Sequence, residues 1–126
     1  MESTKDCIFC KIAAGEIPCH KVYEDADYLA FLDINPLSPG HALVITKKHY
    51  RWVWDVPTVG QYFEVAKKVA LAQKKAFGTD LIIAKVLGED VPHAHIQVYP
   101  DQKVAGDKKD FAVNAEKIQS VLLGKS

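Results

Sequence analysis

Two histidines and a glutamine alternate along one short segment of the chain, VPHAHIQVYP at residues 91–100. If this segment is a strand, His93, His95 and Gln97 share one face, with neighbours about 6.5–7 Å apart, and the apolar residues between them can enter a core. A neutral imidazole can act as a nucleophile or as a general base. The row could therefore carry nucleophilic or acid–base chemistry. The alternative is a solvent-exposed polar face that contains two histidines.

A second group of reactive side chains lies near the N-terminus. Cys7 and Cys10 have the Cys-x-x-Cys spacing of many zinc sites, and His49 and His93 are the candidates for the two further ligands that such a site needs. The cysteine pair could also be a redox-active dithiol, although the βαβ context of such motifs is missing, or two small buried thiols. With Cys19 the cysteine count is odd, which is unlike a disulfide framework, and a reducing compartment would leave the thiols free.

The elements that must position these residues can be predicted from hydrophobic patterns. Strands are expected at residues 20–24, 28–33, 41–46, 80–86 and 93–99, a long helix at 58–77, and a short helix after Asn114. Hairpin strands followed by one helix and two more strands do not alternate as a parallel sheet requires. We therefore expect an α+β fold, with an antiparallel sheet of about five strands and the long helix on one face.

The long helix has the clearest pattern. Its apolar face is expected to consist of Val59, Tyr62, Phe63, Ala66, Val69, Ala70, Gln73 and Phe77, which recur at three- and four-residue steps. Thr58 and Gln61 fit a capping box, and Gly78 fits a helix stop. Between the second and third strands, two prolines and a glycine within residues 35–40 predict a loop.

Composition limits the classes of function. The chain has 126 residues, which is one domain, expected over residues 1–126, and it is 48% hydrophobic and 25% charged. Sixteen basic and sixteen acidic residues give a formal net charge of +0. No global field therefore attracts nucleic acid or an anionic membrane, and neither is an expected partner. Without a signal-peptide pattern or a run of about 18 apolar residues, we expect a cytoplasmic protein.

Six motifs in order resemble the histidine triad (HIT) family of nucleotide-binding proteins. They lie at residues 8–12, 15–18, 31–36, 39–45, 47–49 and 93–97. The resemblance covers residues 7–100 and leaves 101–126 as a tail or short helix. It implies an α+β homodimer whose subunits join their sheets across the interface. It also implies cleavage or transfer at the α-phosphate of a purine ribonucleotide conjugate, with a ligand such as AMP or GMP.

The resemblance also implies roles for individual residues. His95 matches the family's nucleophile, which forms a nucleotidyl-histidine intermediate, and Asp33 matches the carboxylate that accepts the ribose hydroxyls. Base-packing positions are Phe9, Ile17, Phe31 and Ile34. The loop positions Gly88 and Asp90, together with His95 and Gln97, complete the expected nucleotide-binding set.

Further matches concern a metal site and His41. Zinc-bearing relatives imply that Cys7, Cys10, His49 and His93 hold a structural Zn²⁺, since four protein ligands leave no open position for water. His41 matches a family histidine beside the site, where it either supports the strand or takes part in catalysis. Cys19 has no match and is expected to be a bystander.

The sequence departs from the usual family pattern in three places, one of which is the stretch at residues 86–92, which is shorter than the family's glycine-rich loop and lacks its usual asparagine and glutamine. Gln97 replaces the third histidine of most hydrolases, as in the nucleotidyltransferase branch, and its amide can donate a hydrogen bond but is no useful proton donor. Asp90 stands where a hydroxyl residue usually contacts the phosphate or leaving group, and a carboxylate there repels phosphate unless it is protonated or paired. A transferase with phosphate or sugar phosphate as acceptor, or a non-catalytic nucleotide sensor, are the alternatives to a hydrolase.

Overall fold

Five strands form one antiparallel sheet in the order β1-β2-β3-β5-β4. The computed structural model describes residues 6–124, so residues 1–5 and 125–126 of the expected domain lie outside the described residues. The strands are β1 (Lys21–Glu24), β2 (Tyr28–Leu32), β3 (Ala42–Thr46), β4 (Ile82–Lys85) and β5 (His95–Pro100). The helices are α1 (Ile8–Ala13), a 3₁₀ turn η2 (Val53–Asp55), α2 (Val59–Phe77) and α3 (Phe111–Leu122). The predicted α+β architecture is confirmed.

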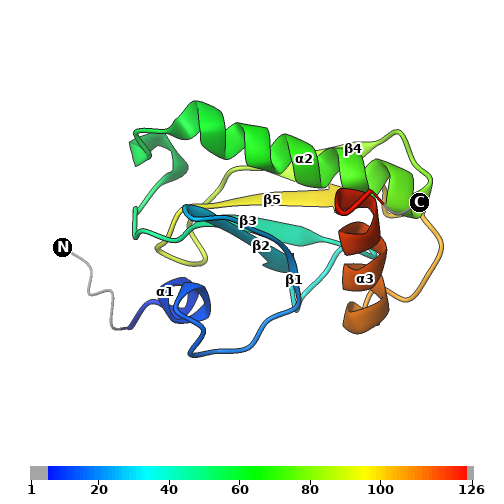
Figure 1. Ribbon diagram of the computed structural model, residues 1–126, viewed down its shortest axis with the longest axis horizontal. Coiled ribbons are helices and arrows are strands. Elements are labelled where there is room, and N and C mark those ends of the chain that lie inside the picture. The colour runs from blue at the N-terminus through cyan, green and yellow to red at the C-terminus, as the bar shows by residue number, and fades with distance from the viewer. Residues whose placement is uncertain (1–5, 125–126) are drawn as a thin grey trace.

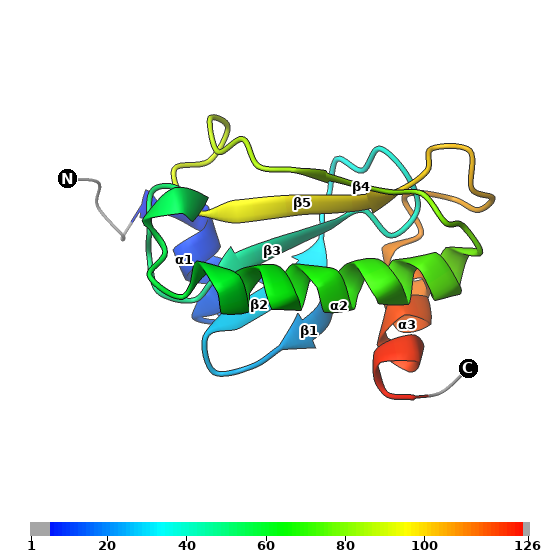
Figure 2. The same ribbon diagram turned by 90° about the horizontal axis from the view of Figure 1, so that it is seen from above.

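The sheet buries residues on both faces, because its strands alternate apolar side chains between two clusters. Toward α2 and α3 lie alternate residues such as Ala30, Val44 and Ile96. On the opposite face Phe31 and Leu43 pack against α1. Figure 1 shows α2 on one side of the sheet and α1 on the other, at the end where β5 begins. Figure 2 shows α2 running along the sheet and α3 at the far end.

The long helix lies where its pattern predicts, and Gly78 ends it in the left-handed conformation, with a φ of 62°. The predicted capping box is wrong, because the Thr58 side chain makes no capping hydrogen bond. Its Oγ1 instead lies 2.6 Å from the Tyr28 hydroxyl. Phe63 is 37% exposed, and Val65 is buried on the face that packs on the sheet.

The strand that carries the histidines begins at His95, two residues later than predicted. The backbone N–H of His93 donates to the Val91 carbonyl at 2.8 Å, and that of Ala94 donates to the Tyr50 carbonyl at 2.7 Å. These bonds fix His93 and Ala94 outside the ladder between β3 and β5. The side-chain alternation still holds, since Ala94 lies in the core beneath α2 and the imidazoles lie on the other face.

The terminal helices differ most from the prediction. Helix α1 was not predicted, and α3 begins at Phe111, before the expected position after Asn114. Asp110 caps α3 by accepting a hydrogen bond from the Val113 N–H, and the Asn114 side chain donates to the Asp107 carbonyl at 2.9 Å. Within residues 6–124, no helix combines the length and apolar character that a membrane span requires.

The loop between β2 and β3 is held closed beside the site. The Asp33 N–H donates to the His41 carbonyl at 2.9 Å across its base. At Gly40, where φ is 81°, a Cβ would overlap the Phe77 ring of α2, and the buried Gln73 side chain donates to the Gly40 carbonyl. Only glycine can adopt this φ and leave room for the Phe77 ring. The contacts of Phe77 and Gln73 with Gly40 therefore hold the loop that carries Asp33 and His41 against α2.

Candidate functional site

The four candidate metal ligands meet at the N-terminal end of α1. Their ligand atoms, from Cys7, Cys10, His49 and His93, all lie within 4.8 Å of one another. Cys7 Sγ is 3.2 Å from His93 Nδ1, and Cys10 Sγ is 3.2 Å from His49 Nδ1. Cys7 is the N-cap of α1, so that the first helical turn places both thiols on the same side. The predicted ligand set is thus brought together from α1, the loop after β3 and the loop before β5.

Hydrogen bonding and burial put His93 in a metal-binding form, whereas burial favours the thiol form of Cys10. His93 Nε2 donates to the Thr46 carbonyl at 2.7 Å, so its proton is on Nε2 and the lone pair of Nδ1 faces the sulfurs. Burial lowers the pKa of His93 to about 4, which keeps the imidazole neutral. Burial and the neighbouring Cys7 raise the pKa of Cys10 to about 12, so a bound cation is needed to hold it as a thiolate near neutral pH.

The donor set fits Zn²⁺. Two sulfurs and two imidazole nitrogens are the ligands of closed, tetrahedral structural zinc sites, and the second ring nitrogen of His93 is already held by a carbonyl. Cys10 and His49 are half-buried, while Cys7 and His93 are buried. An ion bound here would tie α1 to the segment that leads into β5.

His95 lies next to this cluster, on the same face of the sheet. Its Nδ1 is 2.7 Å from the carbonyl oxygen of His93, and its Nε2 is 3.0 Å from Oδ1 of Asp90. A carbonyl oxygen can only accept, so Nδ1 carries a proton and donates it. The Phe9 ring packs edge-on against the imidazole at 5.2 Å between centroids, and His95 is only 1% exposed. The face is therefore buried under α1 and is not the solvent-exposed polar face considered as the alternative.

A cavity of about 460 Å³ opens between α1 and the loop after β2. Most of its wall is apolar, and two carboxylates, Asp33 and Asp90, face it. All the predicted base-packing residues line it, namely Phe9, Ile17, Phe31 and Ile34. Phe9 and Phe31 are buried, whereas Ile34 is 73% exposed at the rim. A flat, apolar group such as a nucleobase fits a wall of this kind.

Asp33, which lines this cavity, lies close to the buried His41. Oδ2 of Asp33 is 3.6 Å from His41 Nε2, and its Oδ1 accepts from the Asn35 N–H at 2.9 Å. His41 Nδ1 accepts from the Leu37 N–H at 3.0 Å. Burial lowers the pKa of His41, while the Asp33 carboxylate and the Gln97 side chain oppose this shift. The neutral His41 thus lies beside the Asp33 carboxylate and forms a hydrogen bond with the side chain of the half-buried Gln97.

Two residues have positions that the sequence did not indicate. Gly88 packs beneath the Trp52 ring and its carbonyl accepts from Arg51 at 2.8 Å, and it is not among the residues that line the cavity. Cys19, expected to be a bystander, lines the cavity beside Pro18. Both observations depend on contacts between distant segments, which sequence spacing does not reveal.

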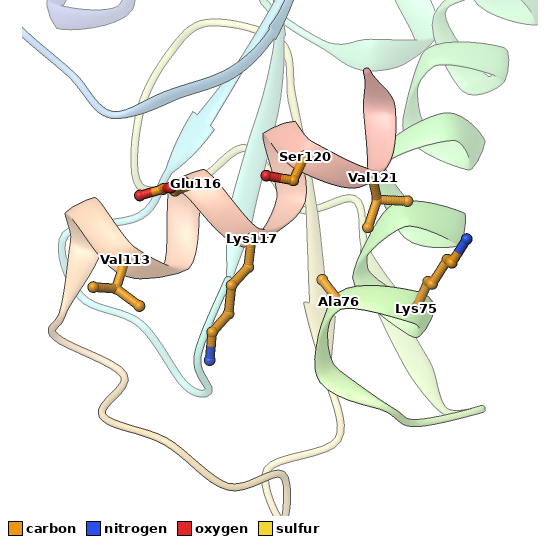
Figure 3. A pocket seen from close by; sticks show the side chains of 7 residues that line it. All are labelled: Lys75, Ala76, Val113, Glu116, Lys117, Ser120 and Val121. Carbon is orange, nitrogen blue, oxygen red and sulfur yellow. The ribbon is translucent and has the colours of Figure 1, made fainter. Parts of the chain in front are cut away.

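A second cavity, of about 580 Å³, lies between the end of α2 and α3 (Figure 3). Its lining is Lys75, Ala76, Val113, Glu116, Lys117, Ser120 and Val121. Figures 1 and 2 place α3 at the opposite end of the sheet from α1. The described residues around this cavity include no histidine or cysteine, so the candidate chemistry is concentrated in the first cavity.

Comparison with known proteins is consistent with this geometry. The HIT domain family model matches residues 14–104. An uncharacterized HIT-like protein from Methanocaldococcus jannaschii is 40% identical over 111 residues, which are 83% of this chain and 86% of that protein. The adenosine 5′-monophosphoramidase HNT1 of Saccharomyces cerevisiae is 37% identical over 97 residues, covering 75% of this chain and 61% of HNT1.

Solved structures of HIT proteins have the same fold. The crystal structure of a Zn-bound histidine triad family protein from Mycobacterium smegmatis superposes with a TM-score of 0.82 at 28% identity. The match covers 97% of this chain and 96% of that one. The shared fold thus extends beyond the motifs into the C-terminal helix.

Proposed function

The chain belongs to the HIT family of nucleotide-binding hydrolases and transferases, and we propose that it cleaves purine ribonucleotide conjugates at the α-phosphate through a nucleotidyl-histidine. The observation that carries this proposal is the hydrogen bond from His95 Nδ1 to the His93 carbonyl. That bond fixes the tautomer in which Nε2 becomes the nucleophilic nitrogen. His95 is buried and contacts Phe9 and Asp90, two residues that line a cavity that could hold a nucleotide.

The reaction would proceed in two displacements on phosphorus. His95 Nε2 attacks the α-phosphate, the bond to the leaving group breaks, and the nucleotidyl group is held on the ring. Water then displaces it in a hydrolase, and an acceptor such as phosphate or a sugar phosphate displaces it in a transferase. The Gln97 amide and main-chain N–H groups would donate hydrogen bonds to the phosphoryl oxygens as charge develops there. Product analysis with and without such acceptors distinguishes hydrolysis from transfer.

We propose AMP or GMP as the nucleotide part, with the base between Phe9, Ile17, Phe31 and Ile34 and the ribose hydroxyls on Asp33. The activity of the yeast relative makes a phosphoramidate of AMP the first substrate to test. A carboxylate that accepts two hydroxyls selects ribose and not the base. Base preference therefore depends on the apolar wall of the cavity.

The ribose contact gives a binding prediction. Because charge-assisted hydrogen bonds contribute about 1.5–3 kcal/mol, Asp33→Ala should weaken AMP binding by about 10–100-fold. The affinity for 2′,3′-dideoxy-AMP, which lacks both hydroxyls, should change by less than about threefold. Titration calorimetry of both ligands against both proteins measures the difference. Asp80→Ala, which removes an exposed carboxylate outside the cavity, is the matched control. Equal weakening of both nucleotides would contradict the assignment of Asp33 to the ribose.

A non-catalytic nucleotide sensor is the second candidate, and one contact favours it. In the free protein, Asp90 occupies the hydrogen-bonding position at His95 Nε2, where an attacking nitrogen must be open. A sensor would bind AMP or GMP without forming a covalent adduct on His95. Detection of a nucleotidyl-protein in a quenched reaction would exclude it.

We propose that Zn²⁺ is the ion held by the four-residue cluster, with a structural role. Its effect on the proposed chemistry is indirect: the side chain of His93 would bind the ion, while its carbonyl orients His95. The metal would thus anchor the segment that positions the nucleophile.

We also propose a homodimer that forms through β4. This strand is at the edge of the sheet, and Leu81 and Leu87 at its two ends are 52% and 56% exposed. An edge strand has backbone groups free to pair with a second copy, which would join two sheets into one.

Sedimentation equilibrium tests the dimer. The protein should be a dimer at about 10 μM, and a Leu81→Lys/Leu87→Lys variant should dissociate at least about tenfold more readily, since it buries charge at an apolar contact. Leu71→Lys, at an equally exposed leucine of α2, should leave the association unchanged. A monomeric wild-type protein, or equal effects of the two changes, would refute assembly through β4.

A further inference from the structure

Lys85 is a cation on the same face of the sheet as the histidine row. It lies in β4 directly opposite Gln97 of β5, and opposite residues of an antiparallel pair point to the same side. Gln97 is in turn opposite Leu43, which packs on the α1 side of the sheet. The Lys85 ammonium lies 5.5 Å from the centroid of the Tyr99 ring, on the same face. Lys85 therefore lies beside the row that carries the proposed chemistry.

The ammonium group of Lys85 is available to a ligand. The residue is exposed, and within residues 6–124 no carboxylate forms an ion pair with it. Contact with the Tyr99 ring orients the side chain across the face without neutralising its charge. Assembly through β4 would leave this face open, because strand pairing uses the backbone edge and not the side chains. A cation in this position can bind an anion.

The nucleotide cavity and Lys85 lie on opposite sides of β5. The strand order β1-β2-β3-β5-β4 places β5 between β3 and β4, as Figure 2 shows. The cavity is lined by residues of β2 and β3, such as Phe31 and Leu43, and by none of β4. Among the described residues, no lysine or arginine lines it, whereas the carboxylates of Asp33 and Asp90 do. With a nucleoside in the cavity, groups beyond the α-phosphate would therefore lie toward Lys85.

We propose that Lys85 binds an anionic acceptor, a phosphate or a phosphate monoester, which takes the nucleotidyl group from His95. This inference rests on the proposed function. An ammonium group attracts a phosphate dianion, whereas water is neutral and an amine is neutral or cationic. An oxygen of hydrogen phosphate attacks the nucleotidyl phosphorus, the bond from phosphorus to Nε2 breaks, and its electron pair returns to nitrogen. The product is a nucleoside diphosphate, and the proton of hydrogen phosphate stays on its terminal phosphate.

The glutamine at position 97 is compatible with an anionic acceptor. Water must lose a proton as it attacks, and a carboxamide cannot accept one near neutral pH. Hydrogen phosphate attacks through an oxygen that is already negatively charged, so it needs no base at this position. The Gln97 amide lies opposite Lys85 and can donate a hydrogen bond to the incoming phosphate. The two side chains thus form a pair suited to phosphate across neighbouring strands.

Partition of the nucleotidyl intermediate between two acceptors tests this role. The 4-nitrophenyl ester of AMP would form the intermediate and release 4-nitrophenolate. The products AMP and ADP would then be measured with increasing inorganic phosphate at constant ionic strength, and the wild-type protein should form ADP in a saturable manner. Hydrogen bonds to charged groups are worth a factor of about 10–100, and exposed pairs fall at the lower end. Lys85→Met, which keeps the side-chain stem, should therefore lower the ratio of ADP to AMP by about 10-fold.

Two variants are matched controls. Lys85→Arg keeps the charge and should keep the ratio within about threefold of the wild-type value. Lys68→Met removes another exposed lysine, whose ammonium lies 5.6 Å from the centroid of the Tyr23 ring. Lys68 belongs to α2, on the side of the sheet opposite α1, so its replacement should leave the ratio unchanged (Figure 1).

The other outcomes each have a distinct meaning. Formation of AMP alone at every phosphate concentration would overturn the assignment of Lys85, although the proposed cleavage would stand. An unchanged ratio in Lys85→Met, or equal losses in Lys85→Met and Lys85→Arg, would also overturn it. If the wild-type protein released no 4-nitrophenolate, or if His95→Ala released it at the wild-type rate, the proposed function would fail and this inference with it.

Discussion

Replacing His95 with alanine is expected to lower the turnover of an AMP phosphoramidate by about 10⁴-fold or more, because the nitrogen that forms the intermediate is removed. The loss should appear in kcat and not in affinity for AMP. The variant keeps Asp33 and the apolar wall of the cavity, which we propose to bind the ribose and the base. The replaced side chain is buried beside Phe9. Quenched-flow kinetics and AMP titration of the same variant separate the two quantities.

His95→Gln provides the matched control for this loss. Glutamine keeps a polar side chain of similar length in the same buried position but has no nucleophilic nitrogen. It should be as inactive as His95→Ala if the imidazole is the nucleophile. A variant of either kind that kept about a tenth or more of the wild-type kcat would contradict the assignment.

Loss of the metal is the second large effect that we expect. The purified protein should contain about one zinc ion per chain, held by two thiolates and two imidazoles. Cys10→Ser and His49→Ala should each lose the ion and lower the melting temperature strongly. The free energy of zinc binding to such structural sites is about 10–16 kcal/mol in zinc-finger peptides. This value is the upper limit of the expected loss in the free energy of unfolding. Elemental analysis and thermal unfolding measure both properties.

The third cysteine supplies the control. Cys19 is also a half-buried thiol, but it lines the nucleotide cavity and lies outside the metal cluster, so Cys19→Ser should keep one zinc ion per chain. Cys10→Ser should also lower kcat more than it weakens AMP binding, because the His93 carbonyl orients His95. Full metal content in Cys10→Ser and His49→Ala, or none in the wild-type protein, would refute the zinc proposal.

Local spacing predicted the Cys7–Cys10 pair and the face of β5, and the family resemblance added His49 and His93 as metal ligands. The Cys7–Cys10 pair and the alternation of His93, His95 and Gln97 are visible without a structure, because one helical turn and one strand fix their geometry. The small helix that carries the thiols was missed. Six residues are too few to show a helical period, and tertiary contacts through Phe9 hold them.

Contacts between segments could not be predicted in the same way. Asp90 was expected in the nucleotide-binding set, with a carboxylate that repels phosphate unless it is protonated or paired, and its partner in the structure is the ring of His95, five residues later. The loop before β5 turns back there because His93 bonds to Val91 and Ala94 bonds to Tyr50. No residue pattern indicates this turn. Cys19 lines the cavity for a related reason, since the folding of residues 14–20 around α1 brings it there.

The proposed reaction depends on a covalent bond between His95 and a nucleotide. The most direct test mixes the protein with an AMP phosphoramidate, quenches the reaction in alkali, where a phosphorus–nitrogen bond on histidine survives, and maps the adduct by mass spectrometry. We expect one adenylyl group per active site, on His95, formed and consumed at rates compatible with turnover. Turnover without any adduct, or an adduct on another residue, would contradict the account.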